Sequence, residues 1–412
     1  MPLESSRLRG QSETRHPFHQ TLNTKHHTPN TTMDILQYTP EHDAFRERLK
    51  AFIAKEVTPN VDQWEKDGIE PRDIWQKMGQ GGFLCTDIDP AYGGMGGDFL
   101  YSVIVTEELS YSNHTGLAAG LHSDVVVPYI SAFGNDDQKQ KYLPGCVSGD
   151  IITAVAMTEP GAGSDLAGMS TTAEQEGDEV VINGSKTFIS NGINADIVII
   201  AAKDPAVENP YQALSLYVVE TGTPGFERGR HLEKMGWRSQ DTAELFFTKC
   251  RIPTANCLGE KGQGFLMLMQ KLQQERLMCA VGAVTAAERI VEWATDYCKN
   301  TTVSGKPLSK PQANQFALVE MATDVKLGRA FMEKLVADHM EGQDIIIETS
   351  MAKYWTTEMA RRVADRAMDL FGNEATIEKY PITRAWRDVR VMSIFAGTNE
   401  VMKGIAAKFM GL

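Results

Sequence analysis

The 412-residue sequence lacks the features that mark several specialised classes of protein. Its six cysteines are scattered and none forms a CxxC pair, which argues against a disulfide framework and a zinc site; the histidines show no metal-ligand spacing either. No apolar run approaches the ~18–20 residues that span a bilayer. Positive charge is scarce, since the net charge is −13, the opposite of the basic footprint that a nucleic-acid binder needs. We therefore expect no metal, no nucleic acid and no transmembrane segment, and the scattered thiols favour a reducing, cytoplasmic location.

The first 32 residues differ from the rest of the chain. They hold four of the nine histidines, few aliphatic residues and a net charge of +2, which leaves −15 for the remainder. They contain no apolar segment of the kind that a secretory signal carries. We expect residues 1–32 to form a disordered tail. Two origins stay open: a transit peptide, which would place the protein in the mitochondrial matrix, or an extension ahead of a start at Met33.

The composition is that of a globular protein, with 42% apolar and 23% charged residues, and the length favours two or three domains. Residues 33–150 are predicted to form an N-terminal helical domain. Its first helix is expected at Thr39-Pro40-Glu41, where a capping residue precedes a proline at the first helical position. Residues 99–110 and 136–147 are predicted to be further helices.

The pattern changes to short β-rich runs over residues 151–260, the predicted middle domain. The runs cover residues 151–157, 179–182, 186–190, 196–201, 214–219 and 245–247. Asn183-Gly184 and Asn191-Gly192 are predicted to be turns between runs. Because the close spacing leaves little room for helices, we expect an antiparallel sandwich or barrel.

Residues 261–412 return to a helical pattern. Residues 265–299 contain no proline and could form one helix roughly 50 Å long at 1.5 Å per residue. Together with residues 311–341, 344–371 and 401–409 it is expected to form a four-helix-type bundle. The predicted fold class is therefore α+β: an N-terminal helical domain, a middle antiparallel β domain and a C-terminal bundle.

Three sequence strings carry most of the chemical information. The first, AMTEPGAGSD at residues 156–165, follows a predicted strand, and its glycines let backbone N–H groups approach an anion or a flat ring. The others are GSKTFISNG at residues 184–192 and FAGTNE at residues 395–400. In this order they resemble the signature loops of the acyl-CoA dehydrogenase family, and the helical–β–helical order agrees with that family's fold. The resemblance covers residues 34–412, and over residues 165–277 it is closest to the long-chain members.

The resemblance implies that FAD binds between the β domain and the bundle. It places Met157 and Thr158 at the flavin edge, Ser164 near phosphate and Phe188 on the isoalloxazine ring. The residues that match cofactor-binding positions are Met157, Thr158, Gly163, Ser164, Phe188, Ile189, Ser190, Gln312, Thr398, Asn399 and Glu400. Those that match substrate-binding positions are Ser164, Arg276, Ala396 and Gly397. The plainer alternative for Phe188 and Ser190 is a routine strand whose side chains alternate between core and surface.

The reaction of this family needs a base, because removing the α-proton of a thioester requires a carboxylate in an apolar site that raises its pKa. Many members place a glutamate just before the Gly-Thr of the C-terminal loop, where this chain has the inert Ala396. Long-chain and isovaleryl-type members use a helix position instead, which Glu275 matches. Glu275 also lies on one apolar-to-small helical stripe: Leu268, Leu272, Glu275, Cys279, Gly282, Ala286, Ile290 and Trp293. We expect Glu275 to be the catalytic base, with Gly282 and Ala286 leaving space beside it.

The alternative for Glu275 is a structural ion pair with Lys271, one turn earlier on the same helix. For Arg276 the alternative to substrate contact is an ordinary salt bridge.

The resemblance also implies the reaction and its partners. Glu275 takes the α-proton of an acyl-CoA, the β-hydrogen leaves as hydride to the flavin, and the backbone N–H of Ala396 polarises the thioester carbonyl. The product is the trans-2-enoyl-CoA of fatty acid β-oxidation, and an electron-transfer flavoprotein accepts the electrons. A medium to long, or branched, acyl chain is expected, and a homo-tetramer or hetero-oligomer.

The sequence departs from the family where one subunit reaches the FAD of its neighbour. Family members usually carry an arginine and a phenylalanine where this chain has Thr301 and Ser304, and a Gln-x-x-Gly-Gly stretch where it has Asp369 to Asn373. Losing an arginine beside pyrophosphate removes a bidentate, charge-assisted contact. Four explanations stay open: a hetero-oligomer whose other subunit supplies the arginine, a homo-oligomer that binds FAD weakly, a flavin-free structural subunit, and an oxidase that uses oxygen.

Overall fold

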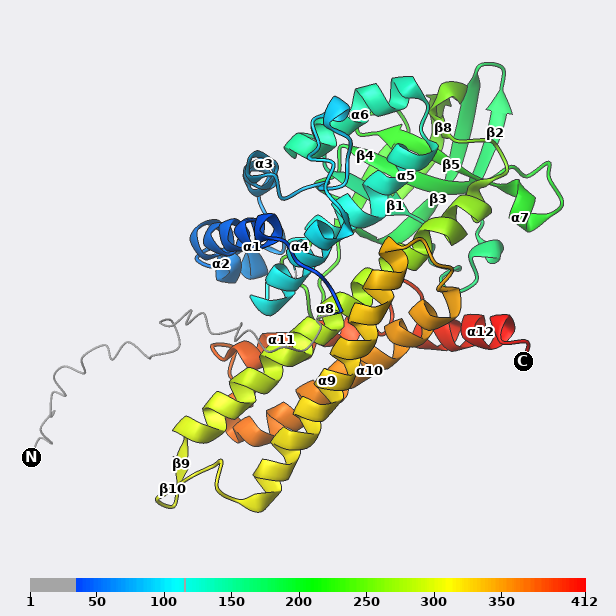
Figure 1. Ribbon diagram of the computed structural model, residues 1–412. Helices are drawn as coiled ribbons and strands as arrows, with labels where there is room; N and C mark the ends of the chain where they lie inside the picture. The colour runs from blue at the N-terminus through cyan, green and yellow to red at the C-terminus, as the bar shows by residue number, and fades with distance from the viewer. Residues whose placement is uncertain (1–34, 115) are drawn as a thin grey trace, which may run out of the picture. The chain divides into compact units, whose positions relative to one another are not determined.

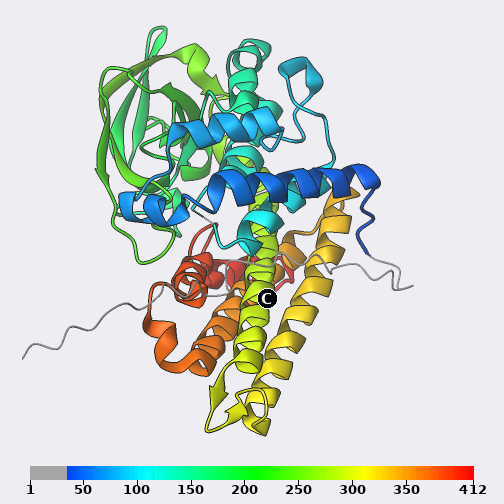
Figure 2. The same cartoon turned by 90° about the vertical axis from the view of Figure 1, so that its left-hand side faces the viewer.

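The computed structural model describes residues 35–114 and 116–412, so the expectation for the tail at residues 1–32 lies outside the described residues. Residues Ile35–Leu412 form one compact unit. Helices cover one side of a β-sheet at one end of this unit, and a bundle of long helices extends from it (Figures 1 and 2). The predicted α+β fold is confirmed.

The first helix begins where the sequence predicts. Thr39 caps α1 (Pro40–Phe52) in a reciprocal capping box, its hydroxyl accepting from the His42 N–H while the His42 ring accepts from the Thr39 N–H. The other predicted helices of this region are α4 (Phe99–Tyr111) and α6 (Asp136–Ser148). The helical segments that the sequence analysis did not single out are α2 (Val61–Asp67), α3 (Arg72–Gly81), α5 (Val127–Phe133), the 3-10 helix η3 (Pro90–Tyr92) and the π-helical η2 (Ile53–Val57) and η4 (Leu121–Val126).

Within the described residues, eight strands form one sheet in the order β6-β7-β3-β2-β4-β5-β8, with β1 paired to β4. The strands are β1 (Thr153–Ala156), β2 (Thr172–Glu176), β3 (Glu179–Ser190), β4 (Ile197–Lys203), β5 (Leu214–Glu220), β6 (Phe226–His231), β7 (Thr242–Pro253) and β8 (Cys257–Leu258). The pairing is antiparallel, as predicted, except where β1 runs parallel to β4 and where Thr172 pairs with Lys203. Short helical turns lie between strands: η5 (Leu166–Gly168), α7 (Pro210–Ala213) and η6 (Thr254–Asn256).

The predicted turn at Asn183-Gly184 is wrong. Residues Glu179–Ser190 form one continuous strand, and the register against β7 shifts between Ile182 and Gly184 and again between Lys186 and Ile189. Gly184 has φ +154°, and a Cβ there would lie 2.4 Å from the Thr171 hydroxyl oxygen. The glycine therefore serves a bulge inside a strand, not a reversal of the chain.

The C-terminal bundle is built on α8 (Gly264–Asn300), which runs away from the sheet (Figure 1). The other predicted helices appear as α9 (Gln312–Met340), α10 (Ile346–Phe371) and α12 (Asn399–Phe409). The sequence analysis did not single out α11 (Pro381–Met392), η7 (Gly372–Thr376) or the hairpin of β9 (Thr302–Val303) and β10 (Lys306–Pro307). No helix among the described residues is both long enough and apolar enough to cross a membrane.

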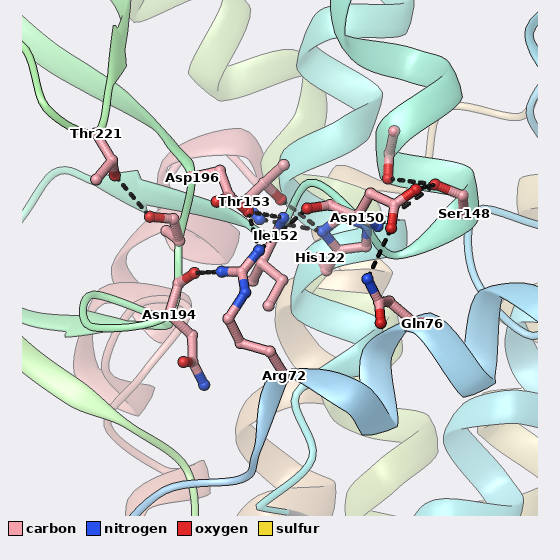
Figure 3. A network of polar contacts seen from close by, with 12 residues as sticks. Arg72, Gln76, His122, Ser148, Asp150, Ile152, Thr153, Asn194, Asp196 and Thr221 are labelled. Carbon is pink, nitrogen blue, oxygen red and sulfur yellow. Dashed lines mark hydrogen bonds and ion pairs between the residues drawn. The ribbon is translucent and has the colours of Figure 1, made fainter.

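A polar network joins the N-terminal helices to the sheet (Figure 3). Arg72 at the start of α3 donates to the backbone carbonyls of Asn194 and Asp150, and to the Asp196 carboxylate at 2.8 Å. His122 is buried, and its two ring nitrogens lie 2.9 Å from the Thr153 hydroxyl and 3.0 Å from a backbone carbonyl. Burial lowers the pKa of His122 to about 4, so it is a neutral core histidine that fixes β1 against the helices.

Candidate active site

Glu275 lies on α8 with no partner for its charge. Its Oε2 atom is buried and accepts no hydrogen bond. Burial raises the pKa of Glu275 to about 7, although the positive charges of Arg276 and Lys353 act in the opposite direction. A carboxylate that titrates near neutrality is suited to accept a proton at physiological pH.

The alternative interpretation of Glu275 as an ion-pair partner of Lys271 does not hold. Among residues 35–114 and 116–412, Glu275 forms no ion pair, and the Lys271 ammonium lies 5.8 Å from the centre of the Phe133 ring. A buried acceptor without a donor costs free energy in the unliganded protein. The position is therefore better explained by a ligand than by stability.

Two further polar groups beside Glu275 also lack partners. The Tyr129 hydroxyl, from α5, and the Arg276 Nε are both buried without a hydrogen bond, and both are within electrostatic reach of Glu275. Arg276 therefore makes no ordinary salt bridge through this nitrogen, in keeping with the predicted substrate contact. Tyr129 was not predicted, because a tyrosine in the apolar run of α5 looks like a core residue.

The space expected beside Glu275 is filled at Gly282, and the pocket at Ala286 lies ~16 Å along α8 from Glu275 at 1.5 Å per residue. A Cβ at Gly282 would lie 3.3 Å from the Ser110 hydroxyl oxygen and 3.7 Å from the Met392 methyl carbon, so α4 and α11 already fill this position. The expectation that Gly282 leaves open space is therefore wrong. A small pocket does open one turn farther along α8, at Ala286, where Trp237 and Trp293 also line it.

The C-terminal loop is held in a rare backbone conformation. Ala396 has φ +55° and Gly397 has φ +91°, both in the left-handed region. The Lys353 ammonium donates to the Gly397 carbonyl at 2.6 Å and to Asn399 Oδ1 at 3.2 Å. Among the described residues, neither the Ala396 N–H nor the Gly397 N–H donates a hydrogen bond, so these donors are available to a ligand.

The predicted cofactor residues of this loop differ in the hydrogen bonds that they make within the protein. Thr398 caps α12 by accepting from the Val401 N–H, and Glu400 is exposed in the first turn of that helix. Asn399 is buried, and its amide is used inside the protein, donating to the Tyr354 carbonyl at 3.2 Å. Asn399 thus fastens the loop to α10, and a cofactor could meet it only through its backbone.

A buried ion pair holds the glycine-rich loop against β3. Lys186 on β3 lies 2.8 Å from the Glu159 carboxylate and also donates to the Met157 carbonyl at 3.1 Å. Met157 and Thr158 are half-buried, and Ser164 is exposed. No atom lies within 4 Å of the position that a Cβ would take at Gly161 or Gly163, so the loop presents open backbone to a ligand.

Phe188 is the most exposed of the predicted cofactor residues in the sheet. Its side chain is 68% exposed, between the buried Thr187 and Ile189, and its φ is +58°. A bulky residue in the left-handed region is strained, and such strain is typical of ligand sites. Ser190 is half-buried, whereas the Ile189 side chain lies in the core of the sheet and could reach a cofactor only through its backbone. The alternative of a routine alternating strand does not account for Phe188.

One predicted cofactor residue lies away from this cluster. Gln312 is exposed at the start of α9, beside the β9–β10 hairpin, at the end of the bundle opposite the sheet (Figures 1 and 2). Along α8 alone, Glu275 and Asn300 are separated by ~37 Å at 1.5 Å per residue. A single chain therefore does not bring Gln312 to the other candidate residues.

Comparison with known proteins gives the same family for all three domains. The acyl-CoA dehydrogenase N-terminal, middle and C-terminal domains match residues 39–150, 154–250 and 262–411. The mitochondrial long-chain specific acyl-CoA dehydrogenase of Sus scrofa is 42% identical over 372 residues, 90% of this chain and 86% of that protein. The crystal structure of an acyl-CoA dehydrogenase from Geobacillus kaustophilus is 52% identical, with a TM-score of 0.90 over 91% of this chain and 99% of that one. A structure described as the FAD complex of PigA is 26% identical, with a TM-score of 0.87 over 92% of this chain and 99% of that one. The chain belongs to the acyl-CoA dehydrogenase family.

Proposed function

We propose that this chain is an FAD-dependent dehydrogenase that converts a saturated acyl-CoA to its trans-2-enoyl-CoA, with Glu275 as the base. The observation that carries the proposal is the buried, unpartnered Oε2 of Glu275, beside two other polar groups that also lack partners. Buried polar groups without hydrogen bonds lower the stability of the unliganded protein, so such a set suits a site that binds a polar ligand.

The residues present fit a flavin. The exposed, strained Phe188 offers a flat apolar face, and the open backbone at Gly161 and Gly163 suits close approach of a ring edge or a phosphate. FAD bound there would supply an acceptor for the β-hydrogen and its electron pair, a chemistry that the chain's own residues lack. The resemblance to the FAD complex of PigA supports the same cofactor.

The chain's own residues then act on the thioester. Glu275 removes the α-proton, and its raised pKa makes it a stronger base than an ordinary carboxylate while a fraction of it stays ionised near neutral pH. The free N–H of Ala396 donates to the thioester carbonyl and stabilises the negative charge that develops there as the α-proton leaves. Arg276 and Tyr129 offer two further unpartnered donors close to Glu275.

The decisive experiment is Glu275→Gln with stopped-flow reduction of bound FAD by a saturated acyl-CoA. We expect the flavin spectrum to persist while the reduction rate falls by at least ~10³-fold, the order found when a catalytic base is removed. Glu260→Gln, the same chemical change at an exposed position just before α8, is the matched control. Reduction at a near wild-type rate in Glu275→Gln would place the base elsewhere.

For the substrate and the electron acceptor we propose a medium to long, or branched, acyl-CoA and an electron-transfer flavoprotein. The long-chain relative at 42% identity supports the chain length. A structure described as an electron transferring flavoprotein of Acidaminococcus fermentans, 33% identical with a TM-score of 0.87, supports the acceptor. A series from butyryl-CoA to palmitoyl-CoA tests the chain length, and a clear optimum at four carbons would contradict it. Comparing the flavoprotein with oxygen as acceptor tests for an oxidase.

A second candidate is that the chain is one subunit of a hetero-oligomer. Its support is the exposed apolar row of Phe316, Val319 and Leu327 on α9, each more than half exposed, beside a hairpin that lacks the family's arginine. Such a row is an interface rather than a solvent face. Co-expression with a related subunit that keeps the arginine, followed by gel filtration, would show whether FAD occupancy depends on a partner. A colourless protein in both cases would favour a flavin-free structural subunit.

A further inference from the structure

Lys353 is a buried cation in the middle of α10. Its side chain has no exposed surface, and the acceptors of its ammonium are the Gly397 carbonyl at 2.6 Å and Asn399 Oδ1 at 3.2 Å. Asn399 Oδ1 also accepts from the Thr357 hydroxyl, one turn later on α10, at 3.2 Å. Burying an ammonium costs several kcal/mol, of the order of the effective penalty for a buried ion, so this arrangement calls for a reason beyond packing.

The loop that Lys353 holds does not adopt its conformation by preference. Ala396 at φ +55° is followed by Gly397 at φ +91°, and an alanine in the left-handed region is disfavoured by roughly 1–2 kcal/mol. The hydrogen bond to the Gly397 carbonyl fixes the peptide between Gly397 and Thr398, one residue after the strained alanine, and the Asn399 N–H donates to the Ser393 carbonyl at 3.1 Å to close the loop. In this conformation the Ala396 N–H stays free for a ligand.

The helix that carries Lys353, α10, packs against α8, which carries the proposed base. Lys353 interacts electrostatically with Glu275 and Cys279 on α8 and with Glu400 on α12, and its charge favours the carboxylate form of Glu275. The other charged or titratable groups around Glu275 are Arg276 and Cys279 on α8 and Tyr129 on α5. Arg276 also favours the carboxylate, so Lys353 is one of two cations that counter its burial.

We propose that Lys353 is a positioning residue with two roles: its hydrogen bond to Gly397 holds the donor loop in place, and its charge supports ionisation of Glu275. This proposal depends on the proposed function only where flavin reduction by acyl-CoA is the measurement. Neither role requires Lys353 to touch the substrate, and together they explain why a lysine, rather than an apolar residue, occupies this buried position.

The test separates the charge from the loop contact. Lys353→Met keeps the volume of the side chain but removes its charge. Asn399→Ala loosens the loop but leaves the charge of Lys353 in place. For flavin reduction by acyl-CoA across pH 5.5–8.5, we expect both variants to lower the plateau rate by ~10-fold or more, the scale of misplacing a donor. Only Lys353→Met should also move the midpoint of the pH profile upward, by about 0.5–1 unit, because a carboxylate that loses a nearby cation ionises at higher pH. An unmoved midpoint in a flavin-bound Lys353→Met protein would overturn the charge role.

A second measurement is independent of turnover. Denaturant unfolding of wild type, Lys353→Met, Glu275→Gln and the double variant forms a double-mutant cycle. We expect coupling between the two residues at pH 8.5, where Glu275 is ionised, and none at pH 5, where it is protonated. Equal coupling at both pH values would overturn the proposal even if acyl-CoA proved not to be the substrate. If Lys353→Met does not fold, Lys353→Arg keeps the charge and should leave the midpoint unmoved while lowering the rate; an upward shift there would count against the idea.

Discussion

Lys186 and Glu159 form an ion pair at 2.8 Å in which both side chains are almost completely excluded from solvent. Glu159 also accepts from the Ser170 hydroxyl at 2.7 Å and from the Thr171 N–H at 2.9 Å. Burial opposes ionisation of Glu159, but the hydrogen bonds from Lys186 and its neighbours together lower the pKa of that carboxyl to about 2. The pair therefore fixes the glycine-rich loop to β3, because Lys186 also binds the Met157 carbonyl.

We predict that Lys186→Met destabilises the protein by about 3–5 kcal/mol, since it leaves a buried carboxylate unpaired. The double variant with Glu159→Gln should recover part of the loss, because no charge remains buried. Chemical denaturation measures the free energy of unfolding. The absorbance of bound flavin shows whether the glycine-rich loop still binds the cofactor. A single variant as stable as wild type would show that the pair does not hold the loop.

Phe188→Ala should lower FAD affinity by ~1–2 kcal/mol with little change in the stability of the apoprotein, because the ring is exposed and packs on little of the protein. Phe246→Ala, which removes another exposed ring from the neighbouring strand β7, should leave the flavin unaffected. The fraction of FAD released on dialysis against buffer without denaturant gives the affinity for FAD. Equal flavin loss in both variants would contradict a specific role for Phe188.

Asp124 is buried in η4, and burial raises its pKa to about 7 from an ordinary value of 3.8. A carboxyl whose pKa is higher in the folded state contributes stability that is full below pH 3.8 and lost as the pH rises through about 7. We therefore predict that Asp124→Asn matches wild type near pH 3.5, gains stability relative to wild type as the pH rises between about 4 and 7, and is more stable by about 1–3 kcal/mol at pH 8.5. Asp178→Asn, at an exposed turn, is the control. A pH-independent difference in unfolding free energy would refute the assignment.

Thr301→Arg should raise FAD occupancy in the homo-oligomer by restoring a charge-assisted contact, with an effect of ~1–3 kcal/mol. Ser304→Phe, the companion change that the family pattern suggests, is less suitable, because Ser304 has φ +50° in the β9–β10 turn and a bulky residue is strained there. Thr301→Gln adds length without charge and is the control. Flavin-to-protein stoichiometry after gel filtration is the measurement, and one tightly held FAD per chain in the unmodified lone protein would refute the idea.

The sequence alone determined the features that depend on local pattern. The capping signal at Thr39, the unbroken period of α8 and the three loop strings predicted the helices, the sheet and the family, because capping and periodicity act over a few residues. The isolation of Glu275 could also be predicted, since a charge on an apolar stripe stands out.

Only the tertiary structure decided which groups meet. Tyr129 belongs to α5 and Glu275 to α8, and their proximity follows from helix packing rather than from spacing in the chain. The same holds for the filling of the Gly282 position by α4 and α11 and for the contact of Lys353 with Gly397. The left-handed backbone at Phe188 and Ala396 runs against the preference of both residues, so local rules could not predict it. The pairing of distant elements imposes these conformations, and there the neighbouring sequence carries no signal.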